Sequence, residues 1–240
     1  MAKDFHHPKV VAGYDEHIRK LIPGYELMHA QVRATFQVHL AADAHVLIIG
    51  CGTGYEIQYL LQHFPKLHIT AVDPSLTMLA QAKHNIQHLA QAEQVTLLHG
   101  TAADLADHLL FDAALSLLVA HFIDNTHKAQ FFAEIYQHLK PNAMLMTYDL
   151  LLHAEEYELN ILQCICQQQG LTLGQSEQML ARLADDFALI SPQGYRDALA
   201  QAGFTHIKTY MQIINYFGFF AQKQARTRSA HVELLPIQTT

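Results

Sequence analysis

The chain has 240 residues, of which half are hydrophobic and 15% are charged, and this composition suits one large α/β domain that buries much of its surface. Its net charge of −7 with neutral histidines disfavours nucleic acid as a partner, so we expect a small-molecule substrate. Three cysteines, no signal-peptide pattern, no apolar run of membrane-spanning length and no HExxH or CxxC motif predict a cytoplasmic protein without a membrane segment or a bound metal.

The first 150 residues alternate between helical and strand patterns. Apolar residues at a four-residue step predict a helix over 25–40, within an N-terminal helical segment or lid that we place at 1–40. Short apolar runs then predict strands at 45–49, 67–72, 95–98, 111–119 and 143–148. The stretches between them predict helices, one of them capped by Ser75. Strands separated by helices imply βαβ units and a parallel sheet.

The pattern changes after residue 150. Residues 154–187 lack strand signals and predict two helices, which we interpret as an insertion over one end of the sheet. Ser191-Pro192 marks the start of a further helix and Gly203 its end. Two last strands, at about 205–211 and 213–222, predict an antiparallel hairpin. The expected fold is a single α/β domain over 1–240, with a doubly wound, mostly parallel seven-stranded sheet.

The turn after the first strand carries the strongest functional signal. It reads Gly50-Cys51-Gly52-Thr53-Gly54 and is followed at once by a predicted helix. Glycines let the backbone turn sharply and approach a ligand closely, while the helix N-terminus offers unpaired N–H groups. In a doubly wound sheet this turn lies at the carboxyl ends of the strands, where ligands bind.

Asp73 ends the second predicted strand, and an acid at about this separation from the glycines can accept hydrogen bonds from ribose hydroxyls. NAD and S-adenosylmethionine (SAM) both carry an adenosine ribose, so Asp73 does not choose between them. The glycine spacing does, because G-x-G-x-G suits a ligand without a pyrophosphate, whereas dinucleotide turns read G-x-G-x-x-G. We therefore predict SAM as the cofactor, with a nicotinamide oxidoreductase as a less favoured alternative.

The order of elements and the glycine turn resemble the class I SAM-dependent methyltransferases over most of the chain. That class usually has an acid two residues before the first glycine, which orients the amino-acid end of SAM, and here the position holds Ile48. It often has Gly-Asp-Ala after the third strand, with the acid near the adenine, and here the segment reads Gly100-Thr101-Ala102. Asp104 is a candidate to replace that acid, although a solvated role is the simpler interpretation.

Several segments resemble more closely the carboxy-S-adenosyl-L-methionine (carboxy-SAM) synthase family, which serves tRNA wobble-uridine modification. They are Ile22-Pro23-Gly24-Tyr25-Glu26, His138-Leu139-Lys140-Pro141, the two-helix insertion, Ala202-Gly203-Phe204 and Asn215-Tyr216-Phe217-Gly218, within about 14–223. The resemblance implies that Tyr25 contacts the amino-acid end of the ligand and that Gly50, Cys51 and Gly52 line its backbone side. It further implies that Asp73 and Pro74 hold the ribose and that Thr101 and Ala102 hold the adenine.

The same resemblance completes the expected cofactor set with Gly54 and with Leu117, which stands where that family has an asparagine. The family binds the extra carboxylate with an arginine of the inserted helices, reaching across a homodimer. Our alignment places Leu180 there, with Arg182 two residues on, a rotation of roughly 200° around a helix. The resemblance therefore implies a possible homodimer and leaves the carboxylate contact in question.

Methyl transfer requires mainly that the protein positions the acceptor and excludes water from the site. SAM already carries the activated methyl group and leaves as S-adenosyl-L-homocysteine. A general base matters only when the acceptor must lose a proton. Candidates near the strand ends are His121, Tyr148, Asp149 and His153, and for the first three a structural role is the simpler interpretation. We predict a SAM-dependent methyltransferase acting on a small molecule, the alternatives being a carboxy-SAM synthase-like enzyme and a non-catalytic SAM-binding protein.

Overall fold

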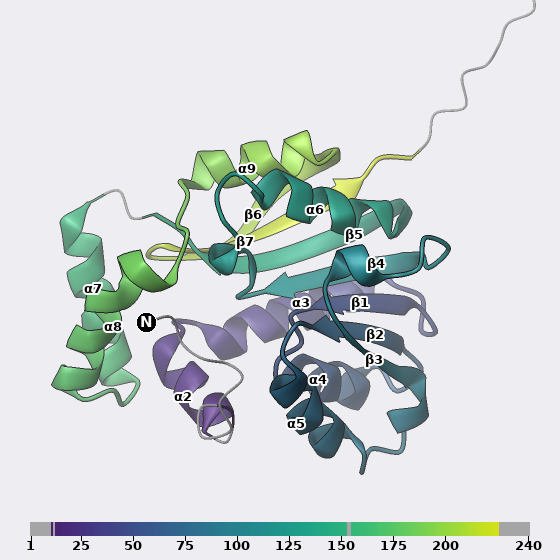
Figure 1. Ribbon diagram of the computed structural model, residues 1–240, viewed down its shortest axis with the longest axis horizontal. Coiled ribbons are helices and arrows are strands. Elements are labelled where there is room, and N and C mark those ends of the chain that lie inside the picture. Colours follow the sequence, from purple (N-terminus) through teal and green to yellow (C-terminus); the bar gives the residue numbers. More distant parts are fainter. Residues whose placement is uncertain (1–10, 12, 153–154, 226–240) are drawn as a thin grey trace, which may run out of the picture.

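A mixed seven-stranded sheet forms the centre of this computed structural model, which describes residues 11, 13–152 and 155–225 (Figure 1). The strand order is β3-β2-β1-β4-β5-β7-β6. The first five strands pair in parallel, and the last two are antiparallel to their neighbours. Their bounds are β1 His45–Ile49, β2 His68–Asp73, β3 Val95–His99, β4 Phe111–Leu117, β5 Leu139–Leu150, β6 Phe204–Ile213 and β7 Tyr216–Lys223.

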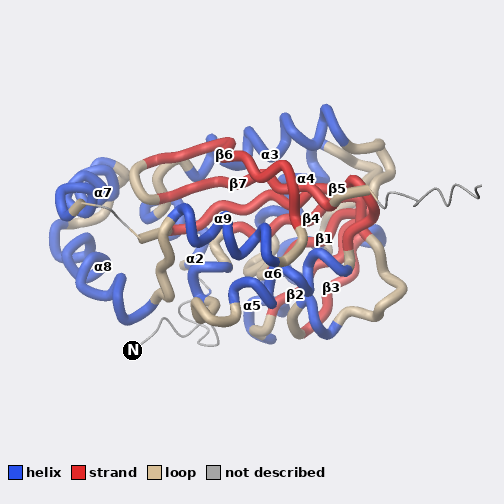
Figure 2. The backbone as a smooth tube through the Cα atoms, turned by 90° about the horizontal axis from the view of Figure 1, so that it is seen from above, coloured by secondary structure: helices blue, strands red, loops and turns tan. Residues whose placement is uncertain are grey.

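Helices cover both faces of the sheet. On one face lie α3 (Tyr25–His39), α4 (Tyr55–His63) and α5 (Leu76–Ile86), and on the other lie α6 (Lys128–Gln137) and α9 (Pro192–Gln201) (Figure 1). Beyond the carboxyl ends of the strands lie α2 (Tyr14–Leu21), α7 (Glu156–Gln168) and α8 (Leu173–Asp186), and Figure 2 shows α7 and α8 at the same end from above. Three 3₁₀ turns complete the chain: η1 Ala92–Gln94, η2 Ala102–Asp104 and η3 Ala120–Phe122.

Alternate residues of β1 enter two different hydrophobic cores. Val46 and Ile48 pack in the core on the α3 and α4 side, whereas Leu47 and Ile49 pack in the core on the α6 and α9 side. All four are buried. This is the reason that the strand is hydrophobic throughout, because side chains along a strand point to opposite faces and both faces are covered.

The predicted fold class is confirmed, including the antiparallel hairpin and the two-helix insertion. The predicted caps are present, since Ser75 Oγ accepts from Met78 N–H at 3.3 Å and Ser191 Oγ from Gly194 N–H at 3.1 Å. The fourth strand ends earlier than predicted, at Leu117, because Leu118 has a left-handed backbone (φ 61°) that turns the chain out of the sheet.

The N-terminal segment and the insertion meet at one end of the molecule. The Cys166 thiol of α7 donates to the Leu21 carbonyl at the end of α2, with a distance of 3.4 Å from sulfur to oxygen. None of the described helices is long and apolar enough to cross a bilayer. The described His, Cys, Asp and Glu side chains form no group of three or more that could hold a metal ion.

Candidate functional site

Two cavities flank Gly50 at the carboxyl end of β1. The larger has a volume of about 240 Å³ and lies between the ends of β1, β2 and β3 and helix α6. The smaller, about 30 Å³, lies between the glycine turn, the end of β4 and helices α2 and α3. The strand order proceeds from β1 to β2 and β3 on one side and from β4 to β5 on the other. The carboxyl ends of β1 and β4 therefore mark the switch point at which ligands bind in such folds.

The glycine turn has a backbone that side chains would disrupt. Gly50 has φ +67°, and a Cβ on it would come within 2.5 Å of Val119 Cγ2. Gly52 has φ +51° with open space where its Cβ would be. The N–H groups of Gly50 and Cys51 both donate to the Val72 carbonyl, at 2.8 and 3.1 Å, which ties the turn to β2. The turn is thus held by the backbone and leaves its outer side open to a ligand.

Asp73 closes the turn from the neighbouring strand. Its Oδ2 accepts from Gly52 N–H and its Oδ1 from Ser75 N–H, each at 2.8 Å. The carboxylate is buried, and two backbone donors hold it between the glycine turn and the start of α5. The carboxylate is therefore fixed at the carboxyl end of β2, and its predicted role in ribose binding stays a prediction.

Three of the predicted cofactor residues, Gly50, Pro74 and Thr101, line the larger cavity. Asp104 lies beside them, and its Oδ2 accepts from the Thr101 backbone N–H at 2.8 Å and from Thr101 Oγ1 at 3.1 Å. These hydrogen bonds from Thr101 lower the pKa of Asp104, which caps η2. Asp104 therefore shapes the turn at Thr101, and its predicted contact with adenine stays untested.

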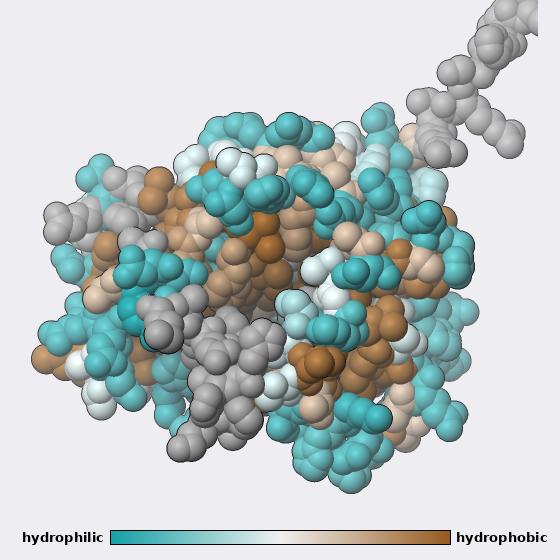
Figure 3. Space-filling model, in the orientation of Figure 1, coloured by the Kyte–Doolittle hydropathy of each residue, from teal (hydrophilic) through white to brown (hydrophobic). Residues whose placement is uncertain are grey.

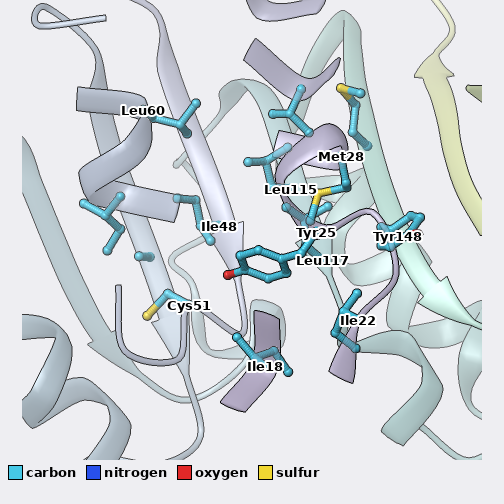
Figure 4. Close-up of a cluster of buried hydrophobic side chains, with 14 of the residues drawn as sticks. Ile18, Ile22, Tyr25, Met28, Ile48, Cys51, Leu60, Leu115, Leu117 and Tyr148 are labelled. Atoms are coloured by element: carbon cyan, nitrogen blue, oxygen red, sulfur yellow. The ribbon is translucent and has the colours of Figure 1, made fainter. Parts of the chain in front are cut away.

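Five of the predicted cofactor residues, Tyr25, Gly50, Cys51, Gly52 and Leu117, line the smaller cavity. Figure 4 shows the Tyr25 ring reaching from α3 between Ile48 and Cys51 with its hydroxyl toward the glycine turn. Burial and then the charge of Glu56 raise the pKa of Tyr25, so its hydroxyl stays protonated. The structure thus brings these residues together as the sequence predicts.

Gly54 and Ala102 line neither cavity. Gly54 has φ +82°, and a Cβ on it would lie 3.1 Å from Ala82 Cβ, so this glycine allows α4 and α5 to approach each other. Ala102 is buried in the core on the α6 side. Both residues shape the turns that carry Cys51 and Thr101, and their predicted contact with the ligand stays a prediction.

Sequence reasoning missed the pair formed by His29 and Glu56. His29 Nε2 lies 3.0 Å from Glu56 Oε1, and Glu56 lines the smaller cavity together with Asp15 and Tyr14. His29 is buried on α3, and Glu56 is the second residue of α4. An acid in the first turn of a helix is ordinary, so nothing in the local pattern singles out Glu56.

His121, a predicted candidate base, belongs to a buried polar cluster behind the site. Its Nδ1 lies 3.1 Å from Asp149 Oδ1, while Asp149 Oδ2 accepts from the Tyr195 hydroxyl at 2.6 Å. Lys128 is also buried and donates to the carbonyls of Ala120 and Ile123 at 2.7 and 2.6 Å. Burial lowers the pKa of Lys128 to about 8, although the charge of Asp149 opposes this shift. The cluster fixes the turn between β4 and α6, which also carries Val119 of the larger cavity.

Tyr148, the other candidate, is buried with its hydroxyl donating to the Pro23 carbonyl at 2.8 Å. Its position anchors the turn between α2 and α3. His153 lies outside the described residues. Neither His121 nor Tyr148 lines one of the two cavities at Gly50, so the structure gives no support to a catalytic role for them there.

A methyltransferase domain family matches residues 46–142. The carboxy-SAM synthase of Chromohalobacter salexigens is 24% identical over 90% of this chain and 82% of its own length. The malonyl-[acyl-carrier protein] O-methyltransferase of Priestia megaterium is 34% identical over 42% of this chain and 35% of its own length. Phosphoethanolamine N-methyltransferase 2 of Haemonchus contortus, solved with SAM, has a TM-score of 0.68 at 15% identity and matches 93% of this chain, which spans 59% of that protein.

The chain thus matches a methyltransferase domain over residues 46–142 and has the fold of the class I SAM-dependent methyltransferases. The Haemonchus contortus enzyme was solved with SAM, the cofactor that the glycine spacing predicts for this chain. This methyltransferase has a further cavity of about 280 Å³ beyond α2, lined by Phe122 of η3, by the adjacent Phe187 and by side chains of α2 and α8 (His17, Leu21, Gln175, Gln178, Met179, Arg182, Asp186). Figure 3 shows this face of the methyltransferase hollowed near its centre, where hydrophobic side chains gather.

Proposed function

We propose that the methyltransferase transfers the methyl group of SAM to a small molecule bound in the cavity between α2, η3 and α8. The observation that carries the proposal is that this cavity shares its walls with the cofactor region. Helix α2 presents Tyr14 and Ile18 to the smaller cofactor cavity and His17 and Leu21 to the third cavity. Leu118 lines the smaller cavity, and Phe122, four residues further along the same turn, lines the third.

The lining of the third cavity suits a small molecule with both apolar and polar parts. Phe122, Met179 and Phe187 offer an apolar surface, and Arg182 with Asp186 offers an ion pair at 2.8 Å. Small-molecule sites in proteins combine an apolar lining with a few polar groups in this way. SAM needs only that such an acceptor is held in line with its methyl group and shielded from water.

Carboxy-SAM synthesis is the second candidate function, supported by the similarity to carboxy-SAM synthases along nearly the whole chain. Two observations weigh against it. Among the described residues, no Lys or Arg lines either cavity at Gly50, whereas Asp15 and Glu56 line the smaller one, so an extra carboxylate would meet like charge. Leu180 packs against the hydrophobic core, and Arg182 faces the third cavity. We predict that Arg182→Ala leaves the affinity for carboxy-SAM unchanged within one protomer.

Two further proposals concern the setting of the enzyme. The few, scattered cysteines favour a cytoplasmic location, and the resemblance to carboxy-SAM synthases motivates a homodimer formed through α7 and α8. Tyr157 and Ile161 stand one helical turn apart on α7 and are exposed, and they would contribute to such an interface. Light scattering that gives the mass of a single chain at working concentration would contradict the dimer.

A bulky substitution in the third cavity tests the methyltransferase proposal. We expect Met179→Trp to fill the cavity, abolish the formation of S-adenosyl-L-homocysteine with a panel of small hydroxyl- and amine-bearing molecules, and leave SAM affinity unchanged. Glu177→Trp is the matched control, because Glu177 is exposed on the same helix and does not line the cavity. Unchanged turnover in Met179→Trp would place the acceptor elsewhere. Binding of SAM without turnover on any acceptor in the wild type would instead support the non-catalytic alternative.

A further inference from the structure

The position of the acid that usually orients the amino-acid end of SAM holds an apolar residue in this chain. Ile48 occupies that position, is 2% exposed, and packs in the core on the α3 and α4 side. The α-ammonium group of SAM carries a full positive charge, and its burial is costly without an anionic or polar partner. The smaller cavity must therefore supply a carboxylate from another element.

Glu56 has the position and the free oxygen for this role. It lines the smaller cavity with Tyr25, Cys51 and Gly52, and its side chain is 16% exposed. Its Oε1 faces His29 Nε2 at 3.0 Å, while among the described residues Oε2 has no hydrogen-bond partner. One carboxylate oxygen is thus anchored by His29, in a residue that lines the cavity beside the glycine turn.

His29 fixes the place of this carboxylate. Its Nδ1 lies 2.8 Å from the Tyr25 carbonyl, which can only accept, so Nδ1 carries a proton. The remaining nitrogen, Nε2, faces Glu56 Oε1 at 3.0 Å. Tyr25 and Tyr55 pack on the His29 ring, with centroids 4.5 and 4.9 Å away, and prevent it from turning.

We infer that Glu56, positioned by His29, binds the α-ammonium group of SAM in place of the acid that is absent at Ile48. Glu56 lies on α4, directly after the glycine turn, so the carboxylate still approaches the same end of the cofactor. The inference rests on SAM as the cofactor and does not depend on the acceptor. It adds a positioning pair, one side chain from α3 and one from α4, to the residues that the family resemblance implies.

Helix α2 closes this subsite. The smaller cavity of about 30 Å³ has room for about one water molecule, which is less than the amino-acid end of SAM requires. Asp15 of α2 accepts a hydrogen bond from Thr53 Oγ1 of the glycine turn at 2.5 Å, and Tyr14 fills the space beside Glu56. Entry of SAM therefore requires α2 to move away from the turn, and the Glu56 carboxylate becomes accessible when it does.

The test compares SAM and S-adenosyl-L-homocysteine with 5′-methylthioadenosine, which has the same adenosine and, like S-adenosyl-L-homocysteine, a neutral thioether, but no amino-acid end. We expect Glu56→Gln to weaken SAM binding roughly 10- to 100-fold in calorimetric titrations, as for loss of a hydrogen bond to a charged group. S-adenosyl-L-homocysteine, which carries the same ammonium, should lose a similar factor. The affinity for 5′-methylthioadenosine should not change, which also shows that the variant folds.

A change in SAM affinity of less than about twofold, or an equal loss for 5′-methylthioadenosine, would overturn the inference. His29→Gln provides a second test that leaves the carboxylate in place, and we expect the same separation between the two ligands, because the unanchored carboxylate is no longer fixed. Glu93→Gln is the control for removal of a carboxylate, since Glu93 is exposed and far along the chain from the glycine turn. Failure of the wild type to bind SAM would contradict the cofactor assignment itself, and failure to form S-adenosyl-L-homocysteine would affect only the proposed function.

Discussion

Asp73 shows how a single side chain can order a turn and remain suited to a ligand. Its two oxygens accept from the backbone N–H groups of Gly52 and Ser75, and the residue is buried. An ionised carboxylate can accept about four hydrogen bonds, so one such group can both hold a turn and accept from ribose hydroxyls. The same residue therefore links the shape of the glycine turn to cofactor affinity.

Asp73→Ala should weaken SAM binding by about 1–3 kcal/mol, because ribose hydroxyls lose a charged acceptor and the Gly52 N–H loses its partner. Isothermal titration calorimetry measures this loss directly. Asp43→Ala is the matched control, since Asp43 is exposed just before β1. Equal affinities of the wild type and the Asp73 variant would remove this residue from the site.

Most elements follow from the local pattern, and those that bury one regular face follow best. Strand β1 spans the predicted residues 45–49, and helix α4 begins directly after the glycine turn, as predicted. An apolar run defines the strand, and the glycines mark the boundary between the two elements. Leu76 is different: its spacing from Leu79 and Ile86 is that of a buried helix face, yet it is 62% exposed in the first turn of α5. Its exposure depends on what the helix packs against, which one sequence does not reveal.

The residues of the glycine turn could be singled out as candidates because they are adjacent in sequence. Their G-x-G-x-G spacing indicates a sharp turn that a ligand can approach closely. The pair of His29 and Glu56 could not, since the two residues are 27 positions apart and meet only through the packing of α3 on α4. Likewise, the polar cluster of His121, Asp149 and Tyr195 joins three separate elements. Local periodicity predicts elements, whereas side-chain pairs between elements depend on the assembled fold.

The turn between α2 and α3 depends on Tyr148 of the sheet, and this provides a test at the level of the element. Tyr148→Phe should lower the free energy of unfolding by about 1–3 kcal/mol, because the buried Pro23 carbonyl loses its donor. Urea unfolding measures the change, with Tyr157→Phe as a control at an exposed tyrosine. Unaltered stability together with a large loss of methyl transfer would mean that Tyr148 acts on the acceptor instead.

At the scale of the whole molecule, our proposal divides the work between the sheet, which would hold the cofactor, and the helices at its carboxyl end, which would select the acceptor. The glycine turn, Asp73 and the larger cavity belong to elements of the parallel sheet, which the wider methyltransferase class shares. The third cavity is lined by α2, α8 and η3, which lie outside the sheet. Acceptor specificity can therefore differ between relatives that bind the same cofactor, in agreement with the general separation of fold and function.

Native mass spectrometry of the purified protein incubated with SAM tests the central claim most directly, namely that the turn after β1 and the carboxylate of Asp73 form a site for an adenosyl sulfonium. We predict one SAM bound to each chain, displaced by S-adenosyl-L-homocysteine, and no adduct with NAD under the same conditions. A spectrum in which NAD binds and SAM does not, or in which the chain takes up neither, would contradict this account.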